Sequence, residues 1–202
     1  MSVKGRLVPA KHGREQMPLK GKGFDRMDDE VTYTASMDGK IEMQNDRIVV
    51  LPVHEVSGNA ELAEGNIDFR GDIVIHGNVE SGVNIRATGS ITIDGVAEAC
   101  MLEAGKDIIL RGGMLGGNKA SVKTKGAITA KFFEFTNILC EGDLQADVLM
   151  DCSVICHGQI RLTGRKGSII GGKVQAIRGL IATSLGNDAE KRTEIFVGAG
   201  ID

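Results

Sequence analysis

The sequence predicts an all-β protein: a parallel β-helix, or β-solenoid, with a small β-rich cap at its N-terminus. Three observations predict it. Glycines recur at nearly constant spacing, apolar residues alternate with other residues before each glycine, and the apolar residues include few aromatic ones. A repeat of 16 to 21 residues is too short for a pair of helices and suits one coil of a solenoid.

The recurring glycines each open a phrase of the type Gly-x-Ile-x-Ile, as at residues 71–75 and 89–93. The spacings between them are 18, 16, 21, 16, 16 and 21 residues. A glycine at this place suits a bend with a positive φ, or a close approach to the backbone of the next coil. The glycines are Gly71, Gly89, Gly105, Gly126, Gly142, Gly158 and Gly179.

The residues before and after each glycine predict three inward-facing columns, because residues two apart on a strand share a face. Together the columns predict three short strands per coil, paired in parallel between coils about 4.8 Å apart. The first column is Ile85, Val122, Ile138 and Val154; the second is Ala87, Thr124, Cys140 and Cys156; the third is Val79, Val96, Phe133 and Leu149.

We expect about seven coils over residues 58–198, a tail over 199–202, and a β-rich cap over 1–57. In the cap, short strands are predicted at 32–35, 40–43 and 47–50, with turns at 38–39 and 45–46. A six-residue rhythm over 67–91 is typical of left-handed β-helices, but it stops at Val96. We therefore predict a right-handed coil, and a cap that shields the first coil.

Composition limits the classes of function. Apolar residues make up 42% and aromatic residues 3% of the 202 residues, and 24 basic against 27 acidic residues give a net charge of −3. This balance predicts neither a nucleic-acid-binding nor a membrane-surface protein. The apolar run 48–53 is too short to span a bilayer, so we expect no membrane insertion. No secretory signal opens the chain, and four cysteines without framework spacing fit a reducing compartment. We expect a cytoplasmic protein.

Two coils are five residues longer than their neighbours and carry glycine-rich, basic loops over 111–120 and 163–173. Their lengths predict that both loops protrude from one edge, side by side. Such loops are either tolerated insertions or the working face of a solenoid, and backbone N–H groups beside basic side chains suit an anion. The candidate anion-binding residues are Arg111, Lys119, Arg165, Lys166 and Lys173.

An ordered series of phrases resembles the flagellar assembly protein A (FapA) family. The series comprises residues 38–41, 48–53, 65–79, 95–99, 112–116, 131–134 and 166–172. The resemblance implies a β-helix protein of the bacterial cytoplasm, linked to flagellum placement and motility. Members of the family typically carry a further N-terminal domain and a coiled coil after the solenoid. The family offers no agreed catalytic residues.

The residues that suit catalysis or metal binding have simpler explanations. Cys140 and Cys156 lie one coil apart, near Cys152 and His157, but they occupy a column of small core residues. His76 is predicted to face outward without a partner that the spacing dictates. We therefore predict no catalytic residue, no metal site and no cofactor.

A possible partner surface is predicted around Phe132, Phe135 and Met150. Phe133 takes an inward position, so its neighbour Phe132 faces outward, while Phe135 stands where other coils carry Glu98 and Asp151. The first hypothesis is a non-enzymatic scaffold that binds protein partners of the flagellar or polar machinery, and a homo-oligomer is compatible with it. The alternative is a ligand- or nucleotide-binding solenoid enzyme, similar to hexapeptide acyltransferases, that uses the basic loops.

Overall fold

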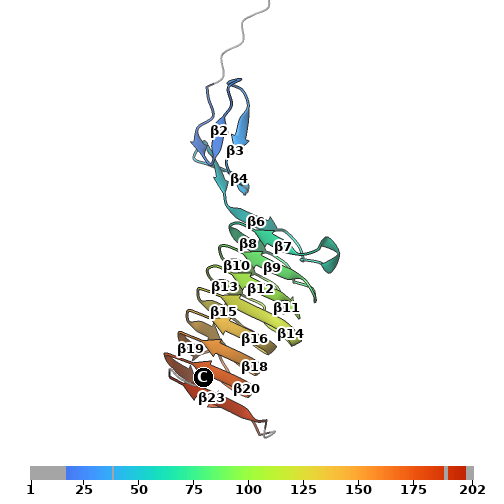
Figure 1. Cartoon of the computed structure of the whole chain (residues 1–202), viewed down its shortest axis with the longest axis vertical. Helices are drawn as coiled ribbons and strands as arrows, with labels where there is room; N and C mark the ends of the chain where they lie inside the picture. Colours follow the sequence, from blue (N-terminus) through green and yellow to red (C-terminus); the bar gives the residue numbers. More distant parts are fainter. Residues whose placement is uncertain (1–16, 38, 189–190, 199–202) are drawn as a thin grey trace, which may run out of the picture.

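The computed structural model describes residues 17–37, 39–188 and 191–198, and confirms the all-β parallel solenoid. Figure 1 shows its strands stacked as successive coils below a narrow N-terminal extension. One sheet has eight strands. In spatial order these are β6 (Val53–Val56), β8 (Asp72–Ile75), β10 (Ile91–Ile93), β13 (Ile108–Leu110), β15 (Ile128–Ala130), β17 (Leu144–Ala146), β19 (Gln159–Leu162) and β21 (Gly179–Ala182).

The second sheet has ten strands, and its longer members bend around one corner of the coil. In the part of the chain that the structure describes, the single helical element is the 3₁₀ turn η1 (Leu62–Glu64), so none of these residues forms a helix long and apolar enough to span a membrane. The strands are β7 (Ile67–Phe69), β9 (Asn84–Ala87), β11 (Ala97–Glu98), β12 (Met101–Ala104), β14 (Met114–Thr124), β16 (Phe132–Cys140), β18 (Val148–Cys156), β20 (Ser168–Ala176), β22 (Ser184–Leu185) and β23 (Thr193–Val197).

Apolar side chains stacked between the two sheets form the core. Ile73, Ile91 and Ile108 lie in register on consecutive coils and are fully buried. The first two predicted inward columns are buried throughout. In the third column the prediction for Val96 is wrong: Ala97 is buried there, between Val79 and Met114.

Six of the seven recurring glycines lie close against a neighbouring coil, where an added Cβ would meet an atom at 2.6 Å or less; the exception is Gly179. The Gly142 N–H donates to the Gly126 carbonyl at 2.9 Å, and a Cβ on Gly142 would lie 2.6 Å from that oxygen. The following aspartate fixes the next coil, since Asp143 Oδ1 accepts the Gln159 N–H at 2.8 Å. A side chain at Gly142 would therefore push against the neighbouring coil.

The bend residues of successive coils form a column linked by backbone hydrogen bonds. Two of the seven glycines lie next to this column in the sequence and not in it. The backbone N–H of Lys106 donates to Gly89 O, and that of Arg178 to Gly158 O, so these residues occupy the places expected for Gly105 and Gly179. The inward side chains set both shifts. Ile91 pairs with Ile108, which places the bend one residue after Gly105, and Ile160 pairs with Leu180, which places it one residue before Gly179.

The two long coils carry their extra residues at different corners, so the loops do not lie side by side as expected. In the first, the register shifts between Leu115 and Ala120, within β14. In the second, the extra residues fall between Leu162 and Ser168, where the chain passes from β19 to β20. The two coils have the same number of extra residues, but these residues lie at different corners.

The N-terminal module is β-rich, as predicted. It contains β1 (Gly21–Lys22), β2 (Phe24–Arg26), β3 (Tyr33–Ala35), β4 (Lys40–Gln44) and β5 (Arg47–Leu51), with an antiparallel hairpin of β4 and β5 turning at Asn45 and Asp46. The expected turn at 38–39 includes Asp38, which lies outside the described residues. Figure 1 shows the module extending from the first coil along the long axis rather than lying across it. The solenoid starts at Val53, five residues before the expected boundary at 58.

Candidate interaction surface

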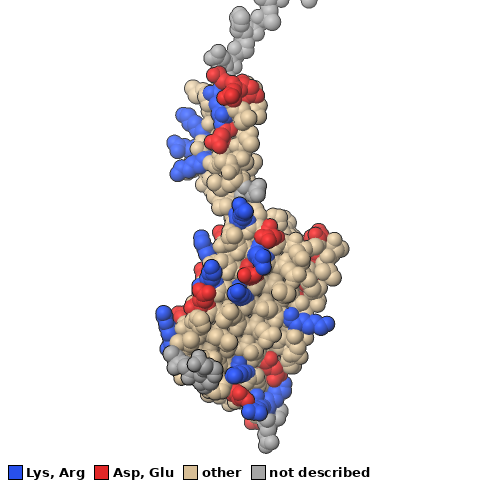
Figure 2. All heavy atoms as spheres, viewed as in Figure 1, with Lys and Arg blue, Asp and Glu red and all other residues tan. Residues whose placement is uncertain are grey.

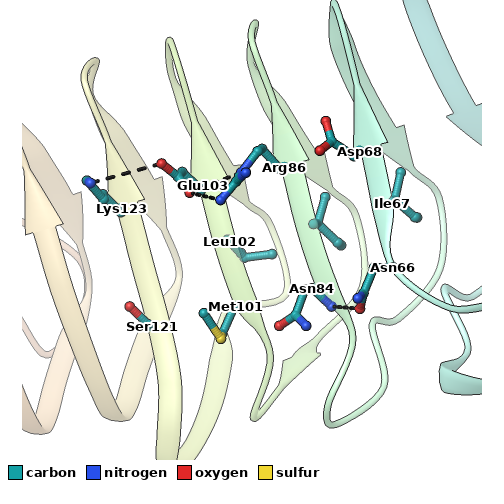
Figure 3. A pocket seen from close by; sticks show the side chains of 11 residues that line it. Asn66, Ile67, Asp68, Asn84, Arg86, Met101, Leu102, Glu103, Ser121 and Lys123 are labelled. Atoms are coloured by element: carbon teal, nitrogen blue, oxygen red, sulfur yellow. Dashed lines mark hydrogen bonds and ion pairs between the residues drawn. The ribbon is translucent and has the colours of Figure 1, made fainter.

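The outer face of the ten-stranded sheet carries a ladder of alternating charges on its first coils. Asp68, Arg86, Glu103 and Lys123 follow one another in register on β7, β9, β12 and β14. Arg86 Nη2 lies 2.9 Å from Glu103 Oε2, and Lys123 Nζ lies 4.0 Å from Glu103 Oε1. Figure 3 shows these side chains bordering an open hollow of about 400 Å³. The charges are largely matched within the ladder, so little net charge remains for a ligand.

A second outward column runs beside the ladder and is mostly amide and hydroxyl. Figure 3 shows Asn66, Asn84, Met101 and Ser121 along it, and the Asn84 backbone N–H donates to Asn66 Oδ1 at 3.0 Å. These groups suit hydrogen bonding to a partner but hold no nucleophile activated by a neighbouring base.

Further along the stack, the charged ladder gives way to apolar side chains. Leu139 and Ile155 are adjacent in register on β16 and β18 and are 36% and 43% exposed. They lie with Asn137 and Ser153 around a shallow hollow of about 200 Å³. We call Leu139 and Ile155 the Leu139 patch. In Figure 2 the visible surface over β14, β16 and β18 holds few charged side chains.

Sequence reasoning missed the Leu139 patch, although a signal was present. The pattern places Leu139 and Ile155 at the outward positions where Arg86 and Lys123 stand on earlier coils. An apolar residue that replaces a charged one in an outward column is an exposed apolar patch.

The structure partly brings together the predicted residues Phe132, Phe135 and Met150. Phe132 and Met150 lie on the same outer face, on β16 and β18, and both are half-buried. The Phe132 ring packs over Gly113, since a Cβ there would lie 2.5 Å from Phe132 Cδ1. Phe135 lies apart, at the corner where the long strands bend.

Phe135 occupies a left-handed backbone conformation, with φ of 47°. Its equivalents on the next coils are Asp151, with φ of 50°, and Gly171, with φ of 70°. The expected equivalence with Glu98 is wrong by one residue, because Glu98 aligns with Leu115 and Glu134.

Lys191 connects this corner to the last loop of the solenoid. Its ammonium group pairs with the Asp151 carboxylate and lies 5.7 Å from the centroid of the Phe135 ring. This contact covers part of the ring, so Phe135 is less accessible than its corner position suggests.

The five basic residues of the predicted anion site do not converge. Arg111 Nε pairs with Asp94 Oδ1 at 3.2 Å, and Lys173 Nζ lies 5.2 Å from the centroid of the Phe196 ring. Lys119 lies in the bulge of β14, at a different corner from Arg165 and Lys166. The basic side chains are therefore spread over separate parts of the solenoid.

The cysteines are buried. Cys140 Sγ and Cys156 Sγ both donate to the Gly142 carbonyl, at 3.3 and 3.2 Å. The contact with Cys156, followed by burial, raises the pKa of the Cys140 thiol. Burial raises the pKa of Cys100 to about 12 and that of Cys152 to about 11. The hydrogen bond with Cys140 lowers the pKa of the Cys156 thiol, whereas the other three thiols stay protonated and are weak nucleophiles and weak metal ligands.

His76 has partners that its sequence neighbourhood did not reveal. Its Nε2 lies 2.8 Å from Glu55 Oε1 and its Nδ1 lies 2.9 Å from Asp94 Oδ2. Hydrogen bonds with Glu55 and then Asp94 raise the pKa of His76. Lys40 from the N-terminal hairpin pairs with Glu55, so this chain of charges ties the hairpin to the first coils.

The fold defines this molecule as a parallel β-solenoid protein whose outer faces are flat sheets. Residues 52–202 match the model of the Flagellar Assembly Protein A (FapA) beta solenoid domain. The chain belongs to this family, which confirms the resemblance seen in the sequence. Neither the curated proteins nor the solved structures compared with this chain include a match.

Proposed function

We propose that this protein is a non-enzymatic scaffold of the FapA type, which binds protein partners of the flagellar or polar machinery in the bacterial cytoplasm. The Leu139 patch carries the proposal: two exposed apolar side chains lie in register on a flat sheet face. Contiguous apolar groups on an exposed surface favour a protein partner, because their removal from water stabilises the complex.

The surroundings of the patch support a protein partner over a small ligand. The hollow beside Leu139 is shallow and is bordered by Asn137, Ser153 and Ser121, which supply hydrogen-bonding groups at the rim. An apolar centre with a polar rim is typical of protein interfaces. The basic loops give the acyltransferase-like alternative no comparable support, because their side chains lie at separate corners.

The experiment replaces the gene in the source cells by one that encodes L139D/I155D. We expect reduced motility or misplaced flagella at an unchanged protein level, since two carboxylates in the patch oppose burial against a partner. The matched control is I109D/I181D. Ile109 and Ile181 have comparable exposure but lie on the eight-stranded sheet.

Normal motility and flagellum placement in a strain without the gene would overturn the proposed function. Normal behaviour of L139D/I155D, together with loss in I109D/I181D, would instead move the partner surface to the other sheet. Capture of a flagellar or polar protein by the wild type, and not by L139D/I155D, supports both parts of the proposal.

A further inference from the structure

We propose that two copies of this chain associate through strand β4, by antiparallel pairing about a two-fold axis at Ile41. This inference is independent of the proposed function. Its starting point is the position of β4 at the edge of the three-stranded sheet β1-β5-β4, where, among the residues that the structure describes, it pairs with β5 alone. A strand edge without a partner is a template for another strand.

The hydrogen-bonding groups of Ile41 and Met43 point to the free edge. Ile48 lies opposite Met43, and its N–H donates to Lys20 O at 2.9 Å, away from β4. Met43 and Ile48 are therefore a non-hydrogen-bonded pair. Because such pairs alternate along antiparallel strands, Ile41 and Val50 form another. The N–H and C=O groups of Met43 and Ile41 are consequently turned outward.

The side chains at this edge are apolar and exposed. Ile41 is 67% exposed and Met43 is 70% exposed. Val50, the cross-strand partner of Ile41, is 6% exposed, because the Gly23 backbone packs against it. On this face of the hairpin, Val50 of β5 is covered by the module, while Ile41 and Met43 of β4 are exposed to solvent.

The start of β4 also has free space beside it. A hollow of about 340 Å³ lies between the hairpin and the first coil, and its lining includes Gly39, Lys40, Glu55 and Phe69. The solenoid therefore leaves space beside the first residues of β4. Figure 1 shows the module projecting beyond the first coil.

The charges on β4 favour a second copy of the chain as the partner at this strand edge. With Ile41 opposite Ile41 of the second copy, each Lys40 faces the Glu42 of the other chain, and each Met43 faces Gly39, which has no side chain. Opposite charges directly across two strands are favourable. Pairing shifted by one residue, centred on Glu42, would place two carboxylates face to face. The sequence of β4 thus complements itself in one register.

Cross-linking tests the register. In the full-length chain, I41C places two sulfurs across a hydrogen-bonded pair with Cα atoms about 5.5 Å apart, within disulfide range. The four native cysteines are buried and do not compete. We expect a covalent dimer from I41C under mild oxidation. The matched control is M43C, whose two sulfurs are held several residues apart, and it should remain monomeric.

Charge exchange tests the choice of partner. Sedimentation equilibrium should show that E42K alone and K40E alone each associate at least about tenfold more weakly than the wild type, since like charges then face each other. An equimolar mixture of the two variants should recover the association, because every facing pair is again opposite. I41K should abolish it, while L139K, a similar change on the solenoid, should not.

A wild-type chain that stays monomeric at all concentrations would overturn the proposal. So would a covalent dimer from M43C and not from I41C, or a mixture of E42K and K40E that associates no better than either variant. Binding of β4 to a different protein, with no self-association, would equally overturn it and assign the edge to that partner.

Discussion

The Nδ1 atom of His76 lies 2.9 Å from Oδ2 of Asp94, one coil further along the stack. Since the Nε2 atom of the same ring lies 2.8 Å from a carboxylate oxygen of Glu55, both nitrogens contact acceptors. Carboxylates only accept hydrogen bonds, so both contacts are hydrogen bonds only when the ring carries two protons. His76 therefore bridges three coils through two hydrogen bonds when it is an imidazolium.

This bridge predicts a pH dependence of stability. The pKa of His76 is raised by Glu55 and Asp94, so its contribution is present in full below its ordinary pKa of about 6.5 and is lost as the pH rises through the raised value. Lys40 and Arg111 pair with the same carboxylates, and the hydrogen bond with Glu55 raises the pKa of Lys40. The effect is small, because the site is exposed to solvent.

The measurement is the melting temperature of wild type and H76N between about pH 6 and pH 9, where the other groups of the network keep their charge. We expect the wild type to be more stable at the lower pH and the difference to shrink as the pH rises. A difference that is constant over the range would contradict the bridge.

Gly142→Ala should destabilise the solenoid by about 1–3 kcal/mol, which is typical of overpacking. The added Cβ would lie 2.6 Å from Gly126 O and would push two coils apart. Gly58→Ala is the matched control, because a Cβ at Gly58 meets nothing within 4 Å. Urea denaturation compares the stability of the two variants. Equal denaturation midpoints would contradict the requirement for glycine at position 142.

Phe133→Ala should cost about 3–5 kcal/mol, because this ring is the largest fully buried side chain in the described part of the chain. Phe135→Gly should change stability by less than about 1 kcal/mol, since glycine relieves the left-handed conformation while the ring contacts are lost. Thermal unfolding of the two variants compares them directly. A larger loss from F135G than from F133A would show that the corner depends on the Phe135 ring.

The thiols should be inert in the folded protein, because all four are at most 1% exposed and out of reach of a reagent in solution. Burial raises the pKa of Cys100 to about 12 and that of Cys152 to about 11, so the reactive thiolates are scarce at about pH 8. A chromogenic disulfide reagent should therefore modify the cysteines only after denaturation. Rapid modification of any native thiol would place that cysteine at the surface or in an opening part of the solenoid.

The sequence by itself determined the coils and most of the core. Alternation is a local property, so it placed Ile85, Val122 and Cys140 inside and Phe132 outside without knowledge of the neighbouring coils. The same alternation put Leu139 outside, but it did not show that Leu139 and Ile155 form an exposed patch.

Only the tertiary structure decided how one coil lies against the next. That relation depends on the number of residues absorbed at each corner, which local patterns do not reveal. Ala97 therefore took the place expected for Val96, and the two long loops lie at different corners. Contacts that join residues 18 and 21 positions apart, as His76 does with Asp94 and Glu55, exist only because stacking brings distant corners within hydrogen-bonding distance.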